Sequence, residues 1–336
     1  AGATLVLDSV LEAEIEDVSR RIAERLRRPY ADFEAGVRKQ ATLPEGAESL
    51  GLAGTAPGFV LEGASTVVVL PGPPPELRRL WPRALETEAV RRVLEGAHAP
   101  DRRVLRFYGA SESEIARALA ESGGDGDGVQ ATICAREFEI HVDLMVEPGG
   151  EERAEDLAGA LRARVGSYLF AEDERRVEEL VLDACRTRGL TLATAESCTG
   201  GLVAARLTSV PGSSDVVVGG VIAYSNEVKT GELGVSAELL ERHGAVSAEA
   251  AEAMAAGARA RLGAGVAISV TGIAGPGGGS EEKPVGLVYL HVQGPDGDLA
   301  RELNLPGDRD AIRGRATAAA LHLVRTLLAQ SRHEGA

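Results

Sequence analysis

Apolar side chains recur at helical spacing in several stretches of the chain. Between residues 9 and 28 an aliphatic residue returns every three or four positions, from Leu11 to Leu26, and this spacing predicts an amphipathic helix. Ser111 and Ser247 precede two further stretches of this kind, at the position where a helix N-cap is expected. The pattern predicts further helices from about residue 199 and over residues 111–122, 151–165, 175–189, 236–244, 247–262 and 308–330.

Shorter apolar runs between these helices predict β-strands. Three prolines at positions 73–75 are expected to end one strand in a rigid turn, which is either purely structural or the edge of a ligand site. Only 3% of the residues are aromatic, so the core must be packed with aliphatic side chains, which suits helices lying on parallel strands. The runs predict strands over residues 65–72, 102–109, 129–146 (two strands), 190–197, 216–225, 265–272 and 286–294.

The order of these elements predicts the fold class. A small β-α-β-β-α unit accounts for the pattern that begins near Asp101. From residue 174 onward strands alternate with helices, and this alternation predicts a three-layer α/β/α domain. The chain as a whole is therefore expected to be an α/β protein.

Charge and composition narrow the classes of partner and compartment. The 336 residues carry a formal net charge of −15 at pH 7, which disfavours binding to nucleic acid or to an anionic membrane. A small anionic ligand is still allowed, because it needs only a local basic or N–H-rich site. Three cysteines are too few for a disulfide framework, and no signal peptide or membrane-spanning run is evident. We therefore expect a cytoplasmic protein, and an N-terminus that is incomplete because the chain does not begin with Met.

The loop that follows the strand over residues 190–197 combines hydroxyl groups with glycines. Its sequence, AESCTGG, ends at the pair Gly200 and Gly201. Hydroxyls and backbone N–H groups at the start of a helix suit a phosphate or an oxyanion, which makes Ser197 and Thr199 candidate site residues. A simple helix N-cap is the alternative, but a cap needs only one hydroxyl and explains neither the glycine pair nor the preceding Glu196.

Two more loops and the start of the last helix add candidate groups. Lys229, in the segment YSNEVK, is either a solvated surface cation or, if it is buried, a base for a serine. Tyr224, at the mouth of the same strand, either packs or assists. The glycine-rich loop from Thr271 either lets the backbone approach a ligand closely or is merely flexible. Arg309 and Arg313 share one helix face, which either reaches an anion or faces solvent.

A thiol and the histidines offer no better chemistry. Cys198 is an alternative nucleophile to Ser197, but adjacent side chains at a strand end point in opposite directions, so only one of the two faces the site. The six histidines show none of the spacings HxH, HxxxH or HExxH, so we expect no metal site in this domain.

Taken in order, AESCTGG, YSNEVK, TGIAGPGGGSEEKPVG and GDRDAIR resemble the C-terminal domain of the competence/damage-inducible protein CinA family. That domain also occurs alone as nicotinamide-mononucleotide (NMN) deamidase. The resemblance covers about residues 174–330. It implies hydrolysis of the NMN carboxamide to nicotinate mononucleotide and ammonia, in pyridine-nucleotide salvage, with no cofactor and in a homodimer.

The resemblance also implies roles for individual residues. Ser197 looks like the nucleophile, Lys229 like its base and Tyr224 like an assisting group. Ser197 either forms an acyl-enzyme or orients an attacking water, with backbone N–H groups near Thr199 stabilising the oxyanion. The residues expected to hold the substrate are Thr199, Gly200, Gly201, Thr271, Gly272, Gly275, Arg313 and Arg309, with Arg313 placed ahead of Arg309.

The earlier part of the chain resembles the same family. RKQATLPEGA (38–47), GTAPG (54–58) and VVLPGPPPEL (68–77) look like the latter part of its molybdopterin-binding-like N-terminal domain. The middle unit resembles its KH-type domain. The implied domains are a partial molybdopterin-binding-like domain over residues 1–98, a KH-type domain over 99–172 and the C-terminal deamidase domain over 173–333.

Two other functions follow from the family. Its N-terminal domain is associated with metal-dependent ADP-ribose pyrophosphatase activity, but the GTEL-type and GGLGPTxDD-type loops have no counterpart here. A divalent metal is therefore expected only of an intact domain. The third hypothesis is a non-enzymatic scaffold in competence or recombination. Nucleic-acid binding is not expected, because the middle unit has no GxxG flanked by basic residues.

Overall fold

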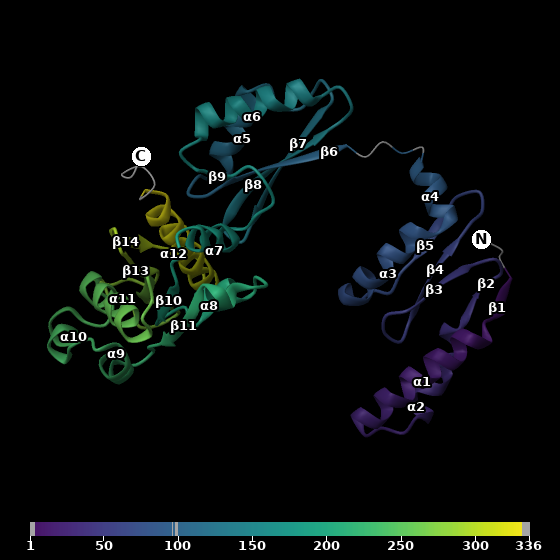
Figure 1. Ribbon diagram of the computed structural model, residues 1–336, viewed down its shortest axis with the longest axis horizontal. Helices are drawn as coiled ribbons and strands as arrows, with labels where there is room; N and C mark the ends of the chain where they lie inside the picture. The colour runs from purple at the N-terminus through teal and green to yellow at the C-terminus, as the bar shows by residue number, and fades with distance from the viewer. Residues whose placement is uncertain (1–3, 96, 98–99, 331–336) are drawn as a thin grey trace. The chain divides into compact units, whose positions relative to one another are not determined.

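The computed structural model describes residues 4–95, 97 and 100–330. It separates the chain into two compact units, residues 1–99 and residues 100–336. Both units combine helices with β-sheets (Figure 1). No helix within the described residues is long and apolar enough to cross a membrane.

The first unit holds two small antiparallel sheets, β1-β2 and β3-β4-β5. Helix α1 (Ser9–Leu26) confirms the helix predicted over residues 9–28, and it buries Leu11 and Ile15. The other elements are β1 (Leu5–Leu7), α2 (Ala31–Gln40), β2 (Thr42–Pro44), β3 (Glu48–Leu52), β4 (Pro57–Leu61), β5 (Val67–Val69), α3 (Pro74–Glu86) and α4 (Glu88–Glu95).

The proline run does not form the predicted rigid turn. Pro73 is the N-cap of α3, and Pro74 and Pro75 lie in its first turn. Amide groups in the first turn have no partner inside the helix, so prolines cost no hydrogen bond there, and their fixed φ suits the helix. The predicted turn was wrong because the prolines begin a helix.

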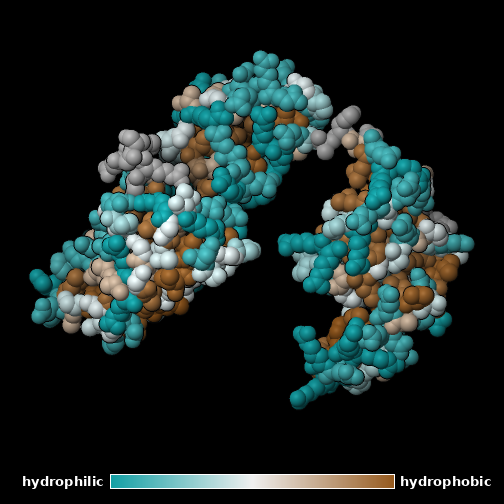
Figure 2. Space-filling view, viewed as in Figure 1, coloured by the Kyte–Doolittle hydropathy of each residue, from teal (hydrophilic) through white to brown (hydrophobic). Residues whose placement is uncertain are grey.

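The middle segment forms a four-stranded antiparallel sheet in the order β7-β8-β6-β9. The helices α5 and α6 pack on it through Ile115, Leu157 and Leu161. Figure 2 shows hydrophilic side chains over α6 and hydrophobic ones beneath it, toward the sheet. The elements are β6 (Asp101–Phe107), α5 (Glu112–Glu121), β7 (Val129–Arg136), β8 (Glu139–Val146), α6 (Glu151–Val165) and β9 (Leu169–Ala171).

The last segment is a three-layer α/β/α domain around a five-stranded sheet in the order β11-β10-β12-β13-β14. The pairs β10-β11 and β10-β12 are parallel, whereas β13 and β14 run antiparallel to their neighbours. The elements are α7 (Val177–Thr187), β10 (Leu192–Glu196), α8 (Leu202–Thr208), a 3-10 turn (Ser213–Asp215), β11 (Val217–Ile222), α9 (Asn226–Leu233), α10 (Ala237–His243), α11 (Ala248–Leu262), β12 (Val266–Gly272), β13 (Leu287–Gly294), β14 (Gly297–Asn304) and α12 (Arg309–Gln330).

Helices cover both faces of this sheet (Figure 1). One apolar cluster joins α7, α8 and α12 to the sheet, and it includes Leu192. A second cluster joins α9, α10 and α11 to the sheet and includes the next residue, Ala193. Successive strand residues face opposite sides, so the two clusters lie on opposite faces. Because β10, β11 and β12 are parallel, their carboxyl ends meet at one edge of the sheet.

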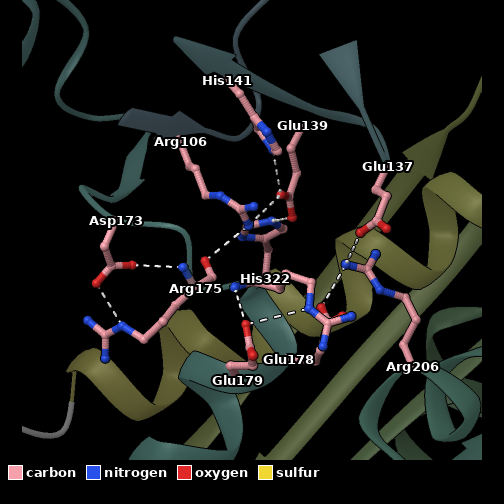
Figure 3. Close-up of polar contacts among 11 residues, drawn as sticks. Arg106, Glu137, Glu139, His141, Asp173, Arg175, Glu178, Glu179, Arg206 and His322 are labelled. Atoms are coloured by element: carbon pink, nitrogen blue, oxygen red, sulfur yellow. Dashed lines mark hydrogen bonds and ion pairs between the residues drawn. The ribbon is translucent and has the colours of Figure 1, made fainter. Parts of the chain in front are cut away.

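A buried polar seam joins the two domains of the second unit (Figure 3). Glu139 in β8 is 1% exposed and accepts a hydrogen bond from Nε2 of His322 in α12 at 2.9 Å. The ring of Tyr108 stacks on that of His322, with centroids 3.7 Å apart. Burial alone would raise the pKa of Glu139, but the neighbouring side chains of His141 and His322 and the charge of Arg206 lower it to about 2. Burial lowers the pKa of His322, so a neutral ring donates to the Glu139 carboxylate.

Candidate active site

Ser197 stands directly after β10, at the edge where the three parallel strands end. Its backbone N–H donates to the carbonyl of Val270 in β12 at 2.8 Å, which extends the strand pairing by one residue. The side chain is partly exposed. The position of Ser197 is therefore fixed by the sheet.

Glu196 anchors the loop from beneath. Its carboxylate is buried and accepts hydrogen bonds from the amides of Gly201 at 2.9 Å, Val203 at 3.1 Å and Ala204 at 2.9 Å. These amides belong to the start of α8, where backbone N–H groups lack helical partners and the helix dipole favours a negative charge. Glu196 thus ties the end of β10 to the first turn of α8.

The two glycines shape the turn between Ser197 and α8. Gly200 and Gly201 have φ values of 62° and 99°, in the left-handed region that glycine adopts without strain. The amide of Gly200 donates to the carbonyl of Ser197 at 3.1 Å, while that of Gly201 is held by Glu196. Both amides are thus paired within the loop, and their role in oxyanion or substrate binding stays a prediction.

Lys229 reaches Ser197 from the next helix. The sequence suggested a loop here, but Lys229 lies in the first turn of α9, which is capped by Ser225. Helical side chains lean toward the N-terminus of their helix, so Lys229 points back toward the sheet edge. Its Nζ donates to Oγ of Ser197 at 3.2 Å and to the carbonyl of Ala223 at 2.7 Å.

The surroundings of Lys229 favour an uncharged amine. The residue is 1% exposed, and both of its hydrogen-bond acceptors are neutral. Burial lowers the pKa of Lys229, because removal from water penalises the ammonium form. The positive end of the α9 dipole acts in the same direction. A buried amine next to a hydroxyl is the arrangement that a serine needs when no histidine serves as its base.

Cys198 faces away from this pair. Its side chain is 5% exposed and belongs to the apolar cluster beneath α8 and α12. Burial raises the pKa of its thiol to about 11. A protonated thiol in the core is a poor nucleophile, so the geometry favours Ser197 over Cys198.

Tyr224 and Arg309 are exposed residues beside the strand ends, and we call this exposed part the mouth of the site. Tyr224 is 59% exposed, and its hydroxyl accepts a hydrogen bond from Nη2 of Arg309 at 2.9 Å. Nη1 of the same guanidinium donates to the carbonyl of Gly275 at 2.6 Å. Arg309 therefore links the strand end at Tyr224 to the glycine-rich loop.

Arg313 supports the Ser197 loop instead of opening outward. Its Nε donates to the carbonyl of Cys198 at 3.1 Å, and its Nη2 donates to that of Thr199 at 2.9 Å. Two N–H groups of the guanidinium are therefore bonded to the backbone of the Ser197 loop. Arg313 thus lies one helical turn from Arg309 but serves a different part of the site.

The remaining predicted residues lie around the same edge, though largely buried. The hydroxyl of Thr271 donates to the carbonyl of Ala245 at 2.6 Å. Thr199 is fully buried, and its hydroxyl has no hydrogen-bond partner within the described residues. A Cβ added to Gly272 would lie 2.7 Å from the carbonyl oxygen of Leu287, and one added to Gly275 would lie 2.6 Å from Val285. Both glycines are therefore needed for close packing of the loop.

Comparison with known proteins places this geometry in a family. The family model of the CinA C-terminal domain matches residues 174–328, and that of the damage-inducible protein CinA KH domain matches residues 102–171. A CinA-like protein of Mycolicibacterium paratuberculosis is 46% identical to this chain over an alignment of 343 positions. The alignment covers 97% of this chain and 79% of that protein. The chain is a member of the CinA family. A CinA-like protein of Mycobacterium sp. (strain JLS) is 45% identical, again over 97% of this chain and 78% of its own length.

Solved CinA-family structures match slightly less than half of the chain. The competence/damage inducible protein CihA of Agrobacterium tumefaciens is 44% identical, with a TM-score of 0.44, and covers 47% of this chain and 99% of its own. A CinA superfamily protein of Klebsiella pneumoniae is 34% identical, with a TM-score of 0.44, over 46% of this chain and 99% of its own.

The residues of this CinA site offer little to a metal ion. Across the described residues there is no group of three or more His, Cys, Asp or Glu side chains placed to hold one. The acid nearest in sequence to Ser197 is Glu196, whose carboxylate is occupied by three amides.

Sequence reasoning missed two contributions to the site. It noted Glu196 as unexplained, yet an acid shortly before a Gly-Gly pair and a helix is a recognisable signal for a capping carboxylate. The carbonyl of Ala223, which holds Lys229, could not have been found, because a backbone group leaves no trace in the residue type.

Proposed function

We propose that the C-terminal domain hydrolyses the carboxamide of nicotinamide mononucleotide to nicotinate mononucleotide and ammonia. One observation carries the proposal, namely the buried Nζ of Lys229 at 3.2 Å from Oγ of Ser197. A serine paired with a neutral amine suits attack on an amide carbon. The four family motifs around this pair support NMN as the substrate.

The proton follows a path set by the contacts of Lys229. In the structure Nζ donates both to Oγ of Ser197 and to the Ala223 carbonyl. A neutral amine has two N–H donors and one lone pair, so rotation about the Cε–Nζ bond turns the lone pair toward the Ser197 hydroxyl while one N–H keeps its bond to Ala223. The lone pair accepts the hydroxyl proton while Oγ bonds to the carboxamide carbon. The C–N bond then breaks, and Lys229 returns the proton to the departing nitrogen, which leaves as ammonia.

Water completes the cycle. It attacks the acyl ester on Ser197 while Lys229 accepts one of its protons, the bond between the acyl carbon and Oγ breaks, and Lys229 returns that proton to Oγ. The acid formed releases the other proton of the water to solvent and leaves as nicotinate mononucleotide. Oxygen and nitrogen balance, since one water enters and one ammonia departs. No cofactor takes part in these steps.

Arg309 is the better candidate for the substrate phosphate, in a reversal of the order predicted from the sequence. Both guanidinium groups have partners in the structure, Arg313 the carbonyls of Cys198 and Thr199 and Arg309 the Gly275 carbonyl and the Tyr224 hydroxyl. Only Arg309 is exposed, so it is the one that a phosphate can reach from solvent. A guanidinium at the mouth matches phosphate oxygens in charge and geometry. We therefore assign Arg309 to phosphate binding and Arg313 to support of the loop.

The test is ammonia release from NMN by the full chain. Ser197→Ala and Lys229→Met are each expected to lower the rate at least about 1000-fold, because nucleophile and base act as a unit. Ser113→Ala and Lys39→Ala are matched controls on exposed helix positions outside the C-terminal domain, and they should stay within about two-fold of the wild type.

Two results would contradict the proposal. Undiminished activity of Ser197→Ala would exclude the serine as nucleophile. A correctly folded wild type that releases no ammonia from NMN would exclude the activity, and would favour the non-enzymatic scaffold.

A further inference from the structure

The hairpin between β7 and β8 ends in an unusual turn. Arg136 pairs with Glu139, so only Glu137 and Phe138 form the loop, with φ values of 52° and 67°. Two left-handed residues make a tight hairpin turn that normally contains asparagine and glycine. Neither residue here is of that kind, so the turn is strained and must be held by its surroundings.

Helix α12 supplies one part of that support. Gly314 lies inside α12, where glycine weakens a helix relative to alanine. A Cβ at this position would lie 2.3 Å from Cε2 of Phe138. The phenylalanine ring thus rests on the bare backbone of α12, and the guanidinium of Arg315 lies 4.9 Å from its centroid.

Helix α8 supplies the other part. Arg206 in α8 donates to Oε2 of Glu137 at 3.2 Å and to the buried carboxylate of Glu178 at 2.8 Å (Figure 3). Figure 3 shows Glu137 pointing from the hairpin toward Arg206. The hairpin tip therefore contacts α8 and α12 together.

These are the two helices that hold the Ser197 loop. Helix α8 begins directly after the loop and is tied to it by Glu196. Helix α12 carries Arg313, which directly precedes Gly314. The guanidinium of Arg313 donates to the carbonyls of Cys198 and Thr199. A shift of either helix would move the loop that carries the nucleophile.

We propose that Phe138 and Glu137 of the KH-type domain are positioning residues for the Ser197 loop. Phe138 sets the place of Arg313 by packing on Gly314, and Glu137 sets the place of α8 by pairing with Arg206. Through these two contacts the middle domain fixes the position of the Ser197 loop in the C-terminal domain and so affects the rate of the proposed reaction. This role rests on the proposed function for its kinetic consequence, but its structural consequence is independent of any substrate.

The first test measures loop opening through a buried thiol. Cys198 lies in the loop and Cys185 lies in α7; both are buried, and burial raises both pKa values to about 11. Mass spectrometry of alkylated full-length protein follows each thiol separately. Phe138→Ala is expected to speed labelling of Cys198 about five-fold and to leave Cys185 within about two-fold.

Companion variants separate positioning from a general loss of stability. Phe138→Leu keeps an apolar side chain on Gly314 and should restore slow labelling. Gly314→Ala favours the helix but collides with the ring, so it should loosen the loop as Phe138→Ala does. Phe33→Ala removes the same ring from α2 in the first unit and should change neither thiol.

The second test measures NMN hydrolysis by the same proteins. Phe138→Ala should lower kcat about ten-fold and change KM less than about three-fold, because misplaced reacting groups slow the chemical step. Unchanged Cys198 labelling in Phe138→Ala, or equal acceleration of both thiols, would overturn the positioning role. If the wild type leaves NMN intact, only the proposed function fails, because the thiol measurement still decides the role of Phe138.

Discussion

The chemistry of the site depends on the charge of one side chain. Lys229 must be neutral to accept the proton of Ser197, and burial lowers its pKa from the ordinary 10.5. We expect kcat/KM for NMN to rise with pH as Lys229 loses its proton, with a midpoint below 10.5. A pH–rate profile measures this limb, and Lys229→Arg, which stays charged, should abolish it. A midpoint at or above 10.5 would speak against Lys229 as the base.

The two arginines of α12 are expected to fail in different ways. Arg309→Ala should raise KM for NMN about 10- to 100-fold with a smaller change in kcat, since it removes a charged partner of the phosphate. Arg313→Ala should mainly lower kcat, because the Ser197 loop loses two hydrogen bonds. Steady-state kinetics with NMN and with nicotinamide riboside, which has no phosphate, separates the two. Equal effects of Arg309→Ala on both substrates would contradict phosphate binding.

At the scale of elements, the start of α8 depends on a single carboxylate. Glu196→Gln leaves one acceptor oxygen for three amides and turns an NH2 group toward donors. We expect a loss of about 2–4 kcal/mol of stability, as when a buried charged hydrogen-bond partner is removed. Thermal and chemical denaturation measure it. Glu238→Gln in the first turn of α10 is the exposed control and should melt like the wild type. A wild-type melting temperature for Glu196→Gln would refute the capping role.

Helices and strands with a regular spacing of apolar residues could be predicted from the sequence. Those that depend on pairing or packing with other segments could not. Helix α1 and the strands β10, β11 and β12 follow from their own apolar patterns. Helix α9 was read as a loop because eight residues with few apolar positions carry little signal, and its cap at Ser225 was overlooked. The edge strand β14 was missed because most of its side chains are exposed and polar, so its pairing with β13 alone defines it.

The same limit applies within the site. The sequence placed Ser197 and Lys229 in separate loops, and only the parallel pairing of β10 with β11 brings them together. It placed Arg313 ahead of Arg309, and residue type does not reveal that Arg313 donates to two backbone carbonyls of the Ser197 loop whereas Arg309 donates to the Gly275 carbonyl and the Tyr224 hydroxyl.

For the second unit as a whole, the buried contact between Glu139 and His322 makes the stability of the fold depend on pH. The pKa of Glu139 is about 2 in the fold against an ordinary 4.5, so its ionised carboxylate stabilises the folded protein above pH 4.5. That contribution is lost as pH falls from 4.5 toward 2. His322, whose pKa is lowered, adds a loss in the same direction as pH falls below 6.5, because the unfolded chain takes up the proton first.

The prediction is that Glu139→Gln melts well below the wild type at pH 7 and that the difference narrows as the pH is lowered to 3. Melting curves across this range measure it. Glu172→Gln removes an exposed partner of Arg162 and should show no such convergence. A difference that stays constant with pH would show that Glu139 is not the source of the acid sensitivity.

The pairing of Ser197 with Lys229 has a consequence for how such a domain diversifies. The proposed nucleophile and base are held by strand pairing, a helix cap and a backbone carbonyl, all of them contacts within the protein backbone or its caps. The groups assigned to recognition, Arg309 and Tyr224, come from other segments at the rim. On the proposed function, bond cleavage and substrate choice are thus encoded by separate segments, so substitutions of Arg309 or Tyr224 are expected to change which amide is accepted while the Ser197–Lys229 pair is retained.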